Sequence, residues 1–167
     1  MSSSRWLARV VGALVIACGL AGCGFHLRGD VTYPFSTLYL NTQAGSPIGT
    51  ELKRTLQAGG TKVTDTASAA EVILDVAPVV DDKQVLSLSG GGRVREYALA
   101  KRVIFSLHDS TGHDWMPSAE IIVRRSYTFN ESEVLARQSE ETRLLREMQT
   151  DVVQQIMRRL QSARKPA

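Results

Sequence analysis

Apolar and polar side chains alternate along the middle of the chain, which is the pattern of strands with one buried face. In the stretch 71–80 three apolar side chains share a face: Val72, Leu74 and Val76. Pro78 cannot donate a backbone hydrogen bond, so we expect this stretch to bend there or to lie at a sheet edge. The apolar pattern resumes over residues 84–89 and ends at Gly90-Gly91-Gly92.

A longer stretch follows, and its apolar side chains keep one parity: Tyr97, Leu99, Val103, Phe105 and Leu107. Lys101 interrupts that row. Residues 109–112 supply turn chemistry, and a return stretch then has a second apolar row: Ile121, Val123, Tyr127 and Phe129. Arg125 stands within this second row. We predict an antiparallel meander with one packed and one wet face.

The segment before this meander predicts a β-α-β opening. Residues 37–40 form a short strand pattern that ends at Asn41, and residues 62–64 form another. Between them Ser46 is a good N-cap and Pro47 a good first helical residue, followed by an apolar stripe of Ile48, Leu52 and Leu56. Gly59-Gly60 is expected to end this helix.

A long helix is predicted after Asn130, with Glu133 three residues further on completing a box-like cap. Val134 and Leu135 open its apolar side, which continues through Leu145, Met148, Val152, Ile156 and Leu160. Residues 138–143 between them are entirely polar. That gap predicts either a solvated turn of helix or a slight break.

These elements predict an α+β fold: a two-layer sandwich with two helices packed on one face of a four- to five-stranded, mostly antiparallel sheet. We expect one domain over residues 37–162. Residues 1–22 are expected to be a cleaved signal, 23–36 a tether, and 163–167 a frayed tail.

The first 22 residues have the three parts of an export signal: Arg5 and Arg9, an apolar run over residues 10–19, and small residues before a break. The sequence Leu20-Ala21-Gly22-Cys23 looks like a bacterial lipobox, in which the cysteine is acylated and becomes the first mature residue. The alternative is an ordinary signal with a chance cysteine. Gly24, rather than aspartate, follows the cysteine, which in such lipoproteins indicates the outer membrane, facing the periplasm.

Cleavage there would also change the charge balance. Arg5 and Arg9 are two of the 20 lysines and arginines, so 18 basic residues remain against 17 acidic ones. A near-neutral chain gives no support to a nucleic-acid partner. Cys18 departs with the signal and Cys23 is acylated, so no disulfide is expected and stability must come from packing.

Candidate catalytic residues crowd the turn His108–Asp114, which contains His108, Asp109, Ser110, His113 and Asp114. Neighbours in a tight turn rarely align as nucleophile, base and orienting acid, and no nucleophile elbow is present. Metal-ligand spacings of the H-E-x-x-H kind are also missing. A solvated turn is favoured over incidental metal binding or catalysis, and we expect no cofactor and no enzyme activity.

The glycine run 90–92 does not lead into a helix, so a flexible hairpin is favoured over a phosphate-binding loop. Arg93 and Arg95 follow it, and Arg124, Arg125 and Arg137 lie further along the chain. Such arginines are usually surface residues. The functional alternative is a guanidinium patch for phosphate groups.

Several of these residues resemble the LPS-assembly lipoprotein LptE family, formerly called rare lipoprotein B. The most specific match is the run Cys23-Gly24-Phe25-His26-Leu27-Arg28-Gly29. Further matches are Glu96-Tyr97, Arg125-Ser126-Tyr127, Leu135-Ala136-Arg137, Arg146-Glu147-Met148 and residues 155–160. The resemblance covers nearly all of the chain after residue 22.

The resemblance implies a two-layer α+β fold and a non-enzymatic protein that plugs the outer-membrane β-barrel LptD, one to one. It implies a part in lipopolysaccharide transport to the outer leaflet and lipopolysaccharide binding through basic residues. Arg137 matches a basic family position. The family's hairpin arginine falls near Gly90 here, so Arg93 or Arg95 would replace it, with Arg124 as a further candidate. The alternatives are a stand-alone lipoprotein scaffold that binds lipid or peptidoglycan, and an envelope hydrolase using the His108–His113 turn.

Overall fold

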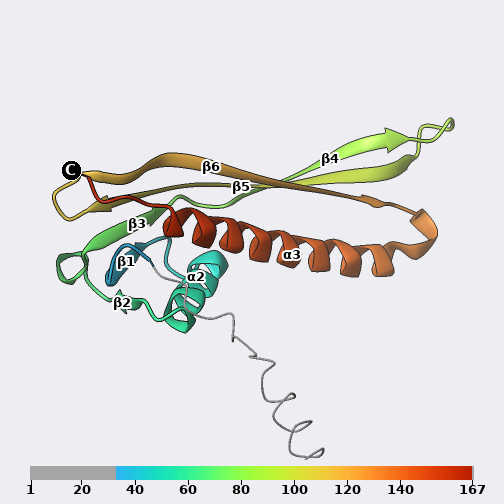
Figure 1. Cartoon of the computed structure of the whole chain (residues 1–167). Coiled ribbons are helices and arrows are strands. Elements are labelled where there is room, and N and C mark those ends of the chain that lie inside the picture. Colours follow the sequence, from blue (N-terminus) through green and yellow to red (C-terminus); the bar gives the residue numbers. More distant parts are fainter. Residues whose placement is uncertain (1–32, 167) are drawn as a thin grey trace, which may run out of the picture.

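The computed structural model describes residues 33–166, and Cys23 and the predicted signal lie outside that range. Within this range two α-helices and six strands follow one another, with two short 3-10 turns (Figure 1). In chain order the elements are β1 Thr37–Asn41, α2 Pro47–Ala58, β2 Lys62–Thr64, η1 Ala67–Ala69, β3 Val72–Val76, β4 Val80–Leu88, β5 Val94–Asp109, β6 Asp114–Thr128, η2 Glu131–Glu133 and α3 Val134–Gln161.

The strands form one mixed sheet in which β2, β1, β3 and β5 lie side by side in that order, β4 also pairs with β5, and β6 pairs with the opposite side of β5. β1 runs parallel to β2 and to β3, and the remaining pairs are antiparallel. Val76 pairs with Phe105 and Val80 with Arg102, so β3 and β4 follow one another along the same edge of β5. The break between them contains Pro78, as the sequence predicted. Within the described residues the sheet has six strands rather than the four or five predicted.

The β1-α2-β2 opening forms as predicted. The Ser46 side chain accepts a hydrogen bond from the Gly49 amide at 3.5 Å, and Pro47 is the first helical residue. The three apolar residues Ile48, Leu52 and Leu56 are buried on one side of α2. Gly60 takes a φ of +83° directly after the helix, a conformation that strongly favours glycine.

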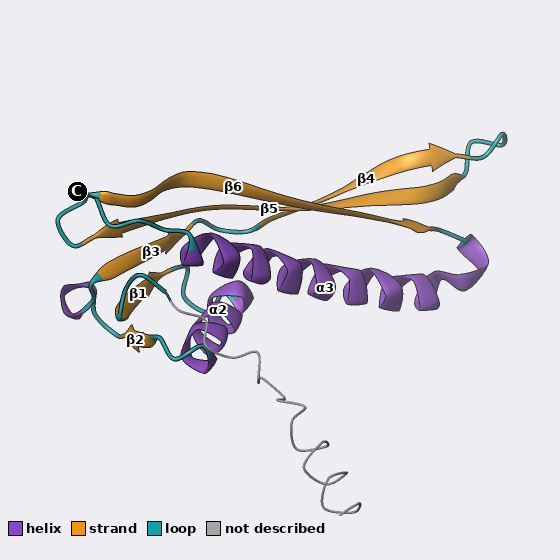
Figure 2. Cartoon of the chain, viewed as in Figure 1, coloured by secondary structure: helices purple, strands orange, loops and turns teal. Residues whose placement is uncertain are grey.

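Both helices pack against one face of the sheet, and the other face is left uncovered by helix (Figures 1 and 2). We call the uncovered side the open face. The core lies between the layers and contains both predicted apolar rows together with the helix stripes, including Leu38, Leu52, Leu74, Val103, Phe105, Leu107, Ile121, Met148, Val152, Ile156 and Leu160. The predicted two-layer α+β sandwich is therefore confirmed.

The start of α3 differs from the prediction. Asn130 caps the short η2 turn, accepting from the Ser132 amide, and α3 begins only at Val134. Val134 and Leu135 are 51% and 83% exposed, so they do not belong to the packed stripe. They precede the part of the helix that faces the deep core. The prediction from apolar spacing, which placed both residues on the buried side of the helix, was therefore wrong.

The polar gap over residues 138–143 is continuous helix, so it is not a break. The buried face of α3 begins at Leu144 and also includes Val153 and Met157. At the other end Ala163 is buried and the Arg164 amide donates to the Trp115 carbonyl at 3.3 Å, so packing reaches past the end of α3. None of the helices within residues 33–166 has the length and apolar character that crossing a bilayer requires.

Candidate functional site

Arg93 and Arg95 lie at the turn of the β4–β5 hairpin, which extends beyond the end of the molecule where α3 begins (Figure 1). Both side chains are exposed. The pairing of β5 with β6 runs without irregularity from Glu96 to Phe105. The pairing of β4 with β5 is irregular beyond Val85, and its last step passes from Glu96 to Val94, so Arg95 lies at the irregularity.

Arg124 lies on the open face, paired across the strands with Ala100. It borders a shallow cavity of about 450 Å³ whose lining includes Ala98 and Ala100. Within the described part of the chain no carboxylate lies within 4 Å of the Arg124 guanidinium, whereas the neighbouring Arg102 pairs with Glu120 at 3.2 Å. Arg124 is thus a cation on the side of the sheet away from the helices.

Arg137 lies in the first turn of α3, on the helix side. Its guanidinium donates to Glu140 at 2.7 Å and to Glu133 at 2.9 Å. The remaining Nε is buried without a hydrogen-bond partner in the described chain. Two carboxylates therefore neutralise Arg137, and a phosphate group would have to compete with them. The structure places Arg93 and Arg95 at the hairpin turn, Arg124 on the open face and Arg137 on α3, so Arg124 and Arg137 lie on opposite sides of the sheet.

A polar cluster that the sequence did not reveal joins α3 to the β4–β5 hairpin. Glu141 lies in the polar stretch of α3 and faces the sheet, where it accepts hydrogen bonds from Lys83 and from the Tyr127 hydroxyl, each at 2.5 Å. The Lys83 ammonium also lies 4.3 Å from the centre of the Tyr97 ring, a cation–π contact. Lys83 pairs with Leu99 of the buried row, so its side chain points to the helix side, which the sequence pattern did not indicate.

Mutual hydrogen bonding sets the protonation of this cluster. Burial alone would raise the pKa of Glu141, but the hydrogen bonds from Lys83 and Tyr127 outweigh it and lower that pKa. Burial likewise opposes the charge of Lys83, and the bonds to Glu141 and Tyr127 raise its pKa. The ion pair is the stable form at neutral pH. Beside it a cavity of about 440 Å³ opens, lined partly by Phe129, Leu145 and Arg137.

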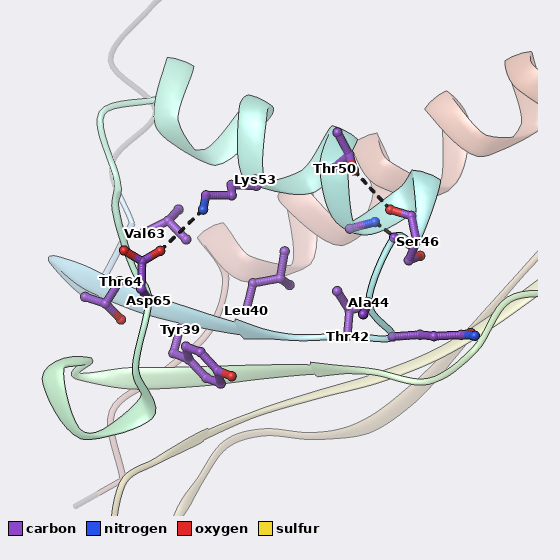
Figure 3. Close-up of a pocket in the computed structure, with 13 residues that line it drawn as sticks. Tyr39, Leu40, Thr42, Ala44, Ser46, Thr50, Lys53, Val63, Thr64 and Asp65 are labelled. Carbon is purple, nitrogen blue, oxygen red and sulfur yellow. Dashed lines mark hydrogen bonds and ion pairs between the residues drawn. The ribbon is translucent and has the colours of Figure 1, made fainter.

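A smaller cavity of about 260 Å³ lies where β1 and β2 meet the start of α2 (Figure 3). Lys53 of α2 reaches Asp65 at 3.5 Å, and both side chains are largely exposed. Gly49 approaches the loop so closely that a Cβ there would lie 2.5 Å from Cγ2 of Thr42. The two charged side chains of this cavity, Lys53 and Asp65, pair with each other, so the cavity presents no obvious reacting group.

The His108–Asp114 turn is held together by its own hydrogen bonds. Asp109 accepts from the Thr111 hydroxyl and from the amides of Thr111 and His113, which holds the pKa of Asp109 down to about 2. His108 uses both ring nitrogens, Nδ1 on the Asp109 carbonyl and Nε2 on Asp75, each at 2.8 Å. With both nitrogens occupied, His108 is not placed as a base for Ser110.

No group of three or more His, Cys, Asp or Glu residues within 33–166 is arranged to hold a metal ion.

The family model LptE, described as lipopolysaccharide assembly, matches residues 34–160 of this chain. The chain belongs to the LptE family. The LPS-assembly lipoprotein LptE of Pectobacterium atrosepticum is 26% identical over 163 residues, covering 93% of this chain and 85% of that protein.

Solved structures of relatives agree with the LptE fold. Lipoprotein B of Nitrosomonas europaea is 35% identical with a TM-score of 0.73, covering 83% of this chain and 91% of that one. Rare lipoprotein B of Shewanella oneidensis, at 24% identity, shares the fold with a TM-score of 0.67 over 75% of this chain and 94% of that one. The resemblance read from the sequence is confirmed. LptE is a family of LPS-assembly lipoproteins and not one of enzymes.

Proposed function

We propose that this LptE-family protein is anchored in the outer membrane through acylated Cys23, faces the periplasm, and plugs the lumen of the LptD barrel as its one-to-one partner. In that place it takes part in lipopolysaccharide transport to the outer leaflet. The observation that carries the proposal is the family match over residues 34–160, nearly the whole folded domain.

The shape of the domain supports the plug. The molecule is elongated, with α3 running along the length of β5 and β6 (Figure 1). Its open face mixes both charges with small apolar residues, including Arg102, Glu120, Arg124 and Ala100. The interior of a wide outer-membrane barrel is polar and wet, so a mixed surface suits it better than a uniformly apolar or strongly charged one.

Lipopolysaccharide binding is the finer part of the proposal. Guanidinium groups bind phosphate through paired hydrogen bonds, and Arg93 and Arg95 are exposed at the hairpin turn. Arg124 presents a cation on the open face, and Arg137 is compensated by Glu133 and Glu140. We therefore rank the hairpin arginines first, Arg124 second and Arg137 third as phosphate ligands.

Depletion of the protein, read out by surface lipopolysaccharide, tests the proposal. Loss of surface lipopolysaccharide on depletion and its return with the wild-type chain are expected. A stand-alone scaffold binding lipid or peptidoglycan predicts normal surface lipopolysaccharide instead. Joint alanine replacement of His108, Ser110 and His113 should restore function like the wild type, whereas a hydrolase using that turn would be inactive.

Charge reversal separates lipopolysaccharide binding from plugging. The double variant Arg93→Glu, Arg95→Glu should weaken binding of purified lipopolysaccharide more than it shifts the unfolding midpoint, because both side chains are exposed. Arg143→Glu, at an exposed pair with Glu147, is the matched control. Unchanged binding in the double variant would reduce the hairpin arginines to ordinary surface residues.

A further inference from the structure

The outer edge of β4 is unpaired in the described chain. β4 spans Val80–Leu88 and pairs with β5 on one side only, so its other side presents a row of backbone N–H and C=O groups. It lies along the stretch of β5 whose other side pairs with β6, so β4 is the edge strand of this part of the sheet (Figure 2). Edges of this kind are templates for pairing with another strand, and proteins usually guard them.

This edge is also apolar. Four large hydrophobic side chains on β4 are at least half exposed: Val80 at 55%, Val85 at 50%, Leu86 at 56% and Leu88 at 57%. Single exposed hydrophobic residues are common on protein surfaces, but a group on one edge strand indicates a surface that another molecule covers.

The charges that would guard the edge are engaged elsewhere. Asp81 accepts a hydrogen bond from Lys101 at 2.6 Å, and Lys83 is bound by Glu141. Asp82 accepts a hydrogen bond from the side-chain Nε2 of Gln84 at 2.7 Å. The remaining protective feature is the register irregularity between Val85 and Leu88, which divides β4 into a regular, acidic first half and an apolar second half.

We propose that the β4 edge is a strand-addition site that takes an extended segment of the barrel partner, an inference that rests on the proposed function. Backbone hydrogen bonds along residues 80–85 join the two strands, and apolar side chains of the added segment cover Leu86 and Leu88. A basic side chain of that segment lies opposite Asp82, which has no ion-pair partner within the described chain.

Charge complementarity selects a partner protein over a second copy of this chain. Parallel self-pairing would place Asp81 and Asp82 beside the same two acids, which is repulsive. Antiparallel self-pairing centred between residues 84 and 85 places Asp81 opposite Leu88, and centring it on residue 84 places Asp82 opposite Leu86. In both registers a carboxylate faces an apolar side chain. A segment with a basic and an apolar half avoids these mismatches.

Hydrogen–deuterium exchange on the full-length protein, alone and in its isolated complex with the barrel, tests the edge directly. Amides of residues 80–88 that exchange fast in the free protein should become protected in the complex. An intact complex in which these amides exchange as in the free protein would overturn the inference and leave the proposed function standing. Failure of the wild-type protein to form any complex would overturn both.

Two further outcomes identify another occupant and overturn the inference. Protection that appears in the isolated protein and grows with its concentration assigns the edge to a second copy. Protection by purified lipopolysaccharide alone assigns it to lipid.

Side-chain variants give an independent measure. The double variant Leu86→Lys, Leu88→Lys should reduce recovery of the barrel roughly tenfold, because it exchanges buried apolar contacts for charge. Leu135→Lys, at a still more exposed leucine at the same end of the molecule but on α3, is the control and should leave recovery unchanged. Equal recovery with both variants would count against strand addition, provided that circular dichroism shows both to be folded.

Discussion

The ammonium group of Lys101 lies 2.6 Å from a carboxylate oxygen of Asp81, and this pair joins the buried row of β5 to the start of β4. The Lys101 side chain is only 6% exposed. Burying an ammonium group is costly unless a carboxylate compensates it. The residue that interrupts the apolar pattern of β5 therefore depends on one neighbour across the sheet.

Asp81→Ala is expected to lower the free energy of unfolding by roughly 2–3 kcal/mol, because it leaves Lys101 buried without its partner. Lys101→Met should be close to neutral, and adding it to Asp81→Ala should restore most of the loss. Urea unfolding of the three variants measures this. If the double variant is as unstable as Asp81→Ala alone, the loss of stability in Asp81→Ala does not come from leaving Lys101 unpaired.

The Glu141 cluster makes the attachment of α3 to the hairpin sensitive to acid. The pKa of Glu141 is lowered from its ordinary 4.5, so its contribution is present above that value and is lost as the pH falls through the folded pKa. We expect wild-type stability to decline below about pH 4.5 and part of that decline to be missing in Glu141→Gln. Thermal unfolding from pH 3 to pH 7 measures the difference. Glu147→Gln, in an exposed pair with Arg143, is the control, and an acid limb identical in wild type and Glu141→Gln would contradict the account.

The pKa of His108 is raised, so its contribution to stability changes with pH in the opposite direction to that of Glu141. Its hydrogen bond to the Asp109 carbonyl and its contact with Asp75 raise the pKa of His108 above 6.5. A raised pKa contributes stability that is complete below 6.5 and is lost as the pH rises through the folded value. Stability should therefore fall as the pH rises above about 6.5 in the wild type, and fall less in His108→Ala. His113→Ala is the control because that ring is largely exposed, and an NMR titration placing the His108 midpoint below 6.5 would exclude this explanation.

Gly49→Ala should destabilise the domain by about 1 kcal/mol although alanine favours helix over glycine, because the new methyl group meets Thr42 at 2.5 Å. Thr42→Ala in the same chain should relieve the contact and restore stability. The comparison requires only unfolding midpoints of the two single variants and the double variant. A Gly49→Ala protein more stable than wild type would show that the loop yields without cost.

Local signals predicted the first third of the fold closely. Ser46, Pro47 and the glycines at 59 and 60 bound α2 as the structure has it, because caps and breakers act within a few residues. The alternation in β5 and β6 likewise assigned the buried rows correctly. Such features follow from the backbone and its immediate neighbours, which a sequence contains.

Long-range pairing was beyond the sequence. In the sequence Glu141 looked like part of a solvated polar stretch. Only the fold shows that Lys83 and Tyr127, which are 58 and 14 residues away along the chain, donate hydrogen bonds to its carboxylate. The same limit applies to Arg137. Its two partners, Glu133 and Glu140, lie within four residues in the sequence, but the burial of its Nε results from packing and cannot be read from the sequence. Val134 and Leu135 show the converse error, since apolar spacing does not reveal where the underlying core begins.

Mass spectrometry of the mature amino terminus tests the anchor. We expect the first residue to be Cys23 carrying acyl chains, since stable anchoring requires more than one chain. A Cys23→Ala variant should accumulate unprocessed. An unmodified Cys23 in the mature protein would remove the proposed membrane attachment.

The central claim is that this chain works as the partner of an outer-membrane barrel in lipopolysaccharide assembly. Its most direct test is the native mass of the full-length protein purified from outer membranes in mild detergent. The account predicts a complex with a much larger barrel protein at equal stoichiometry. A monodisperse lipoprotein with no companion would contradict it.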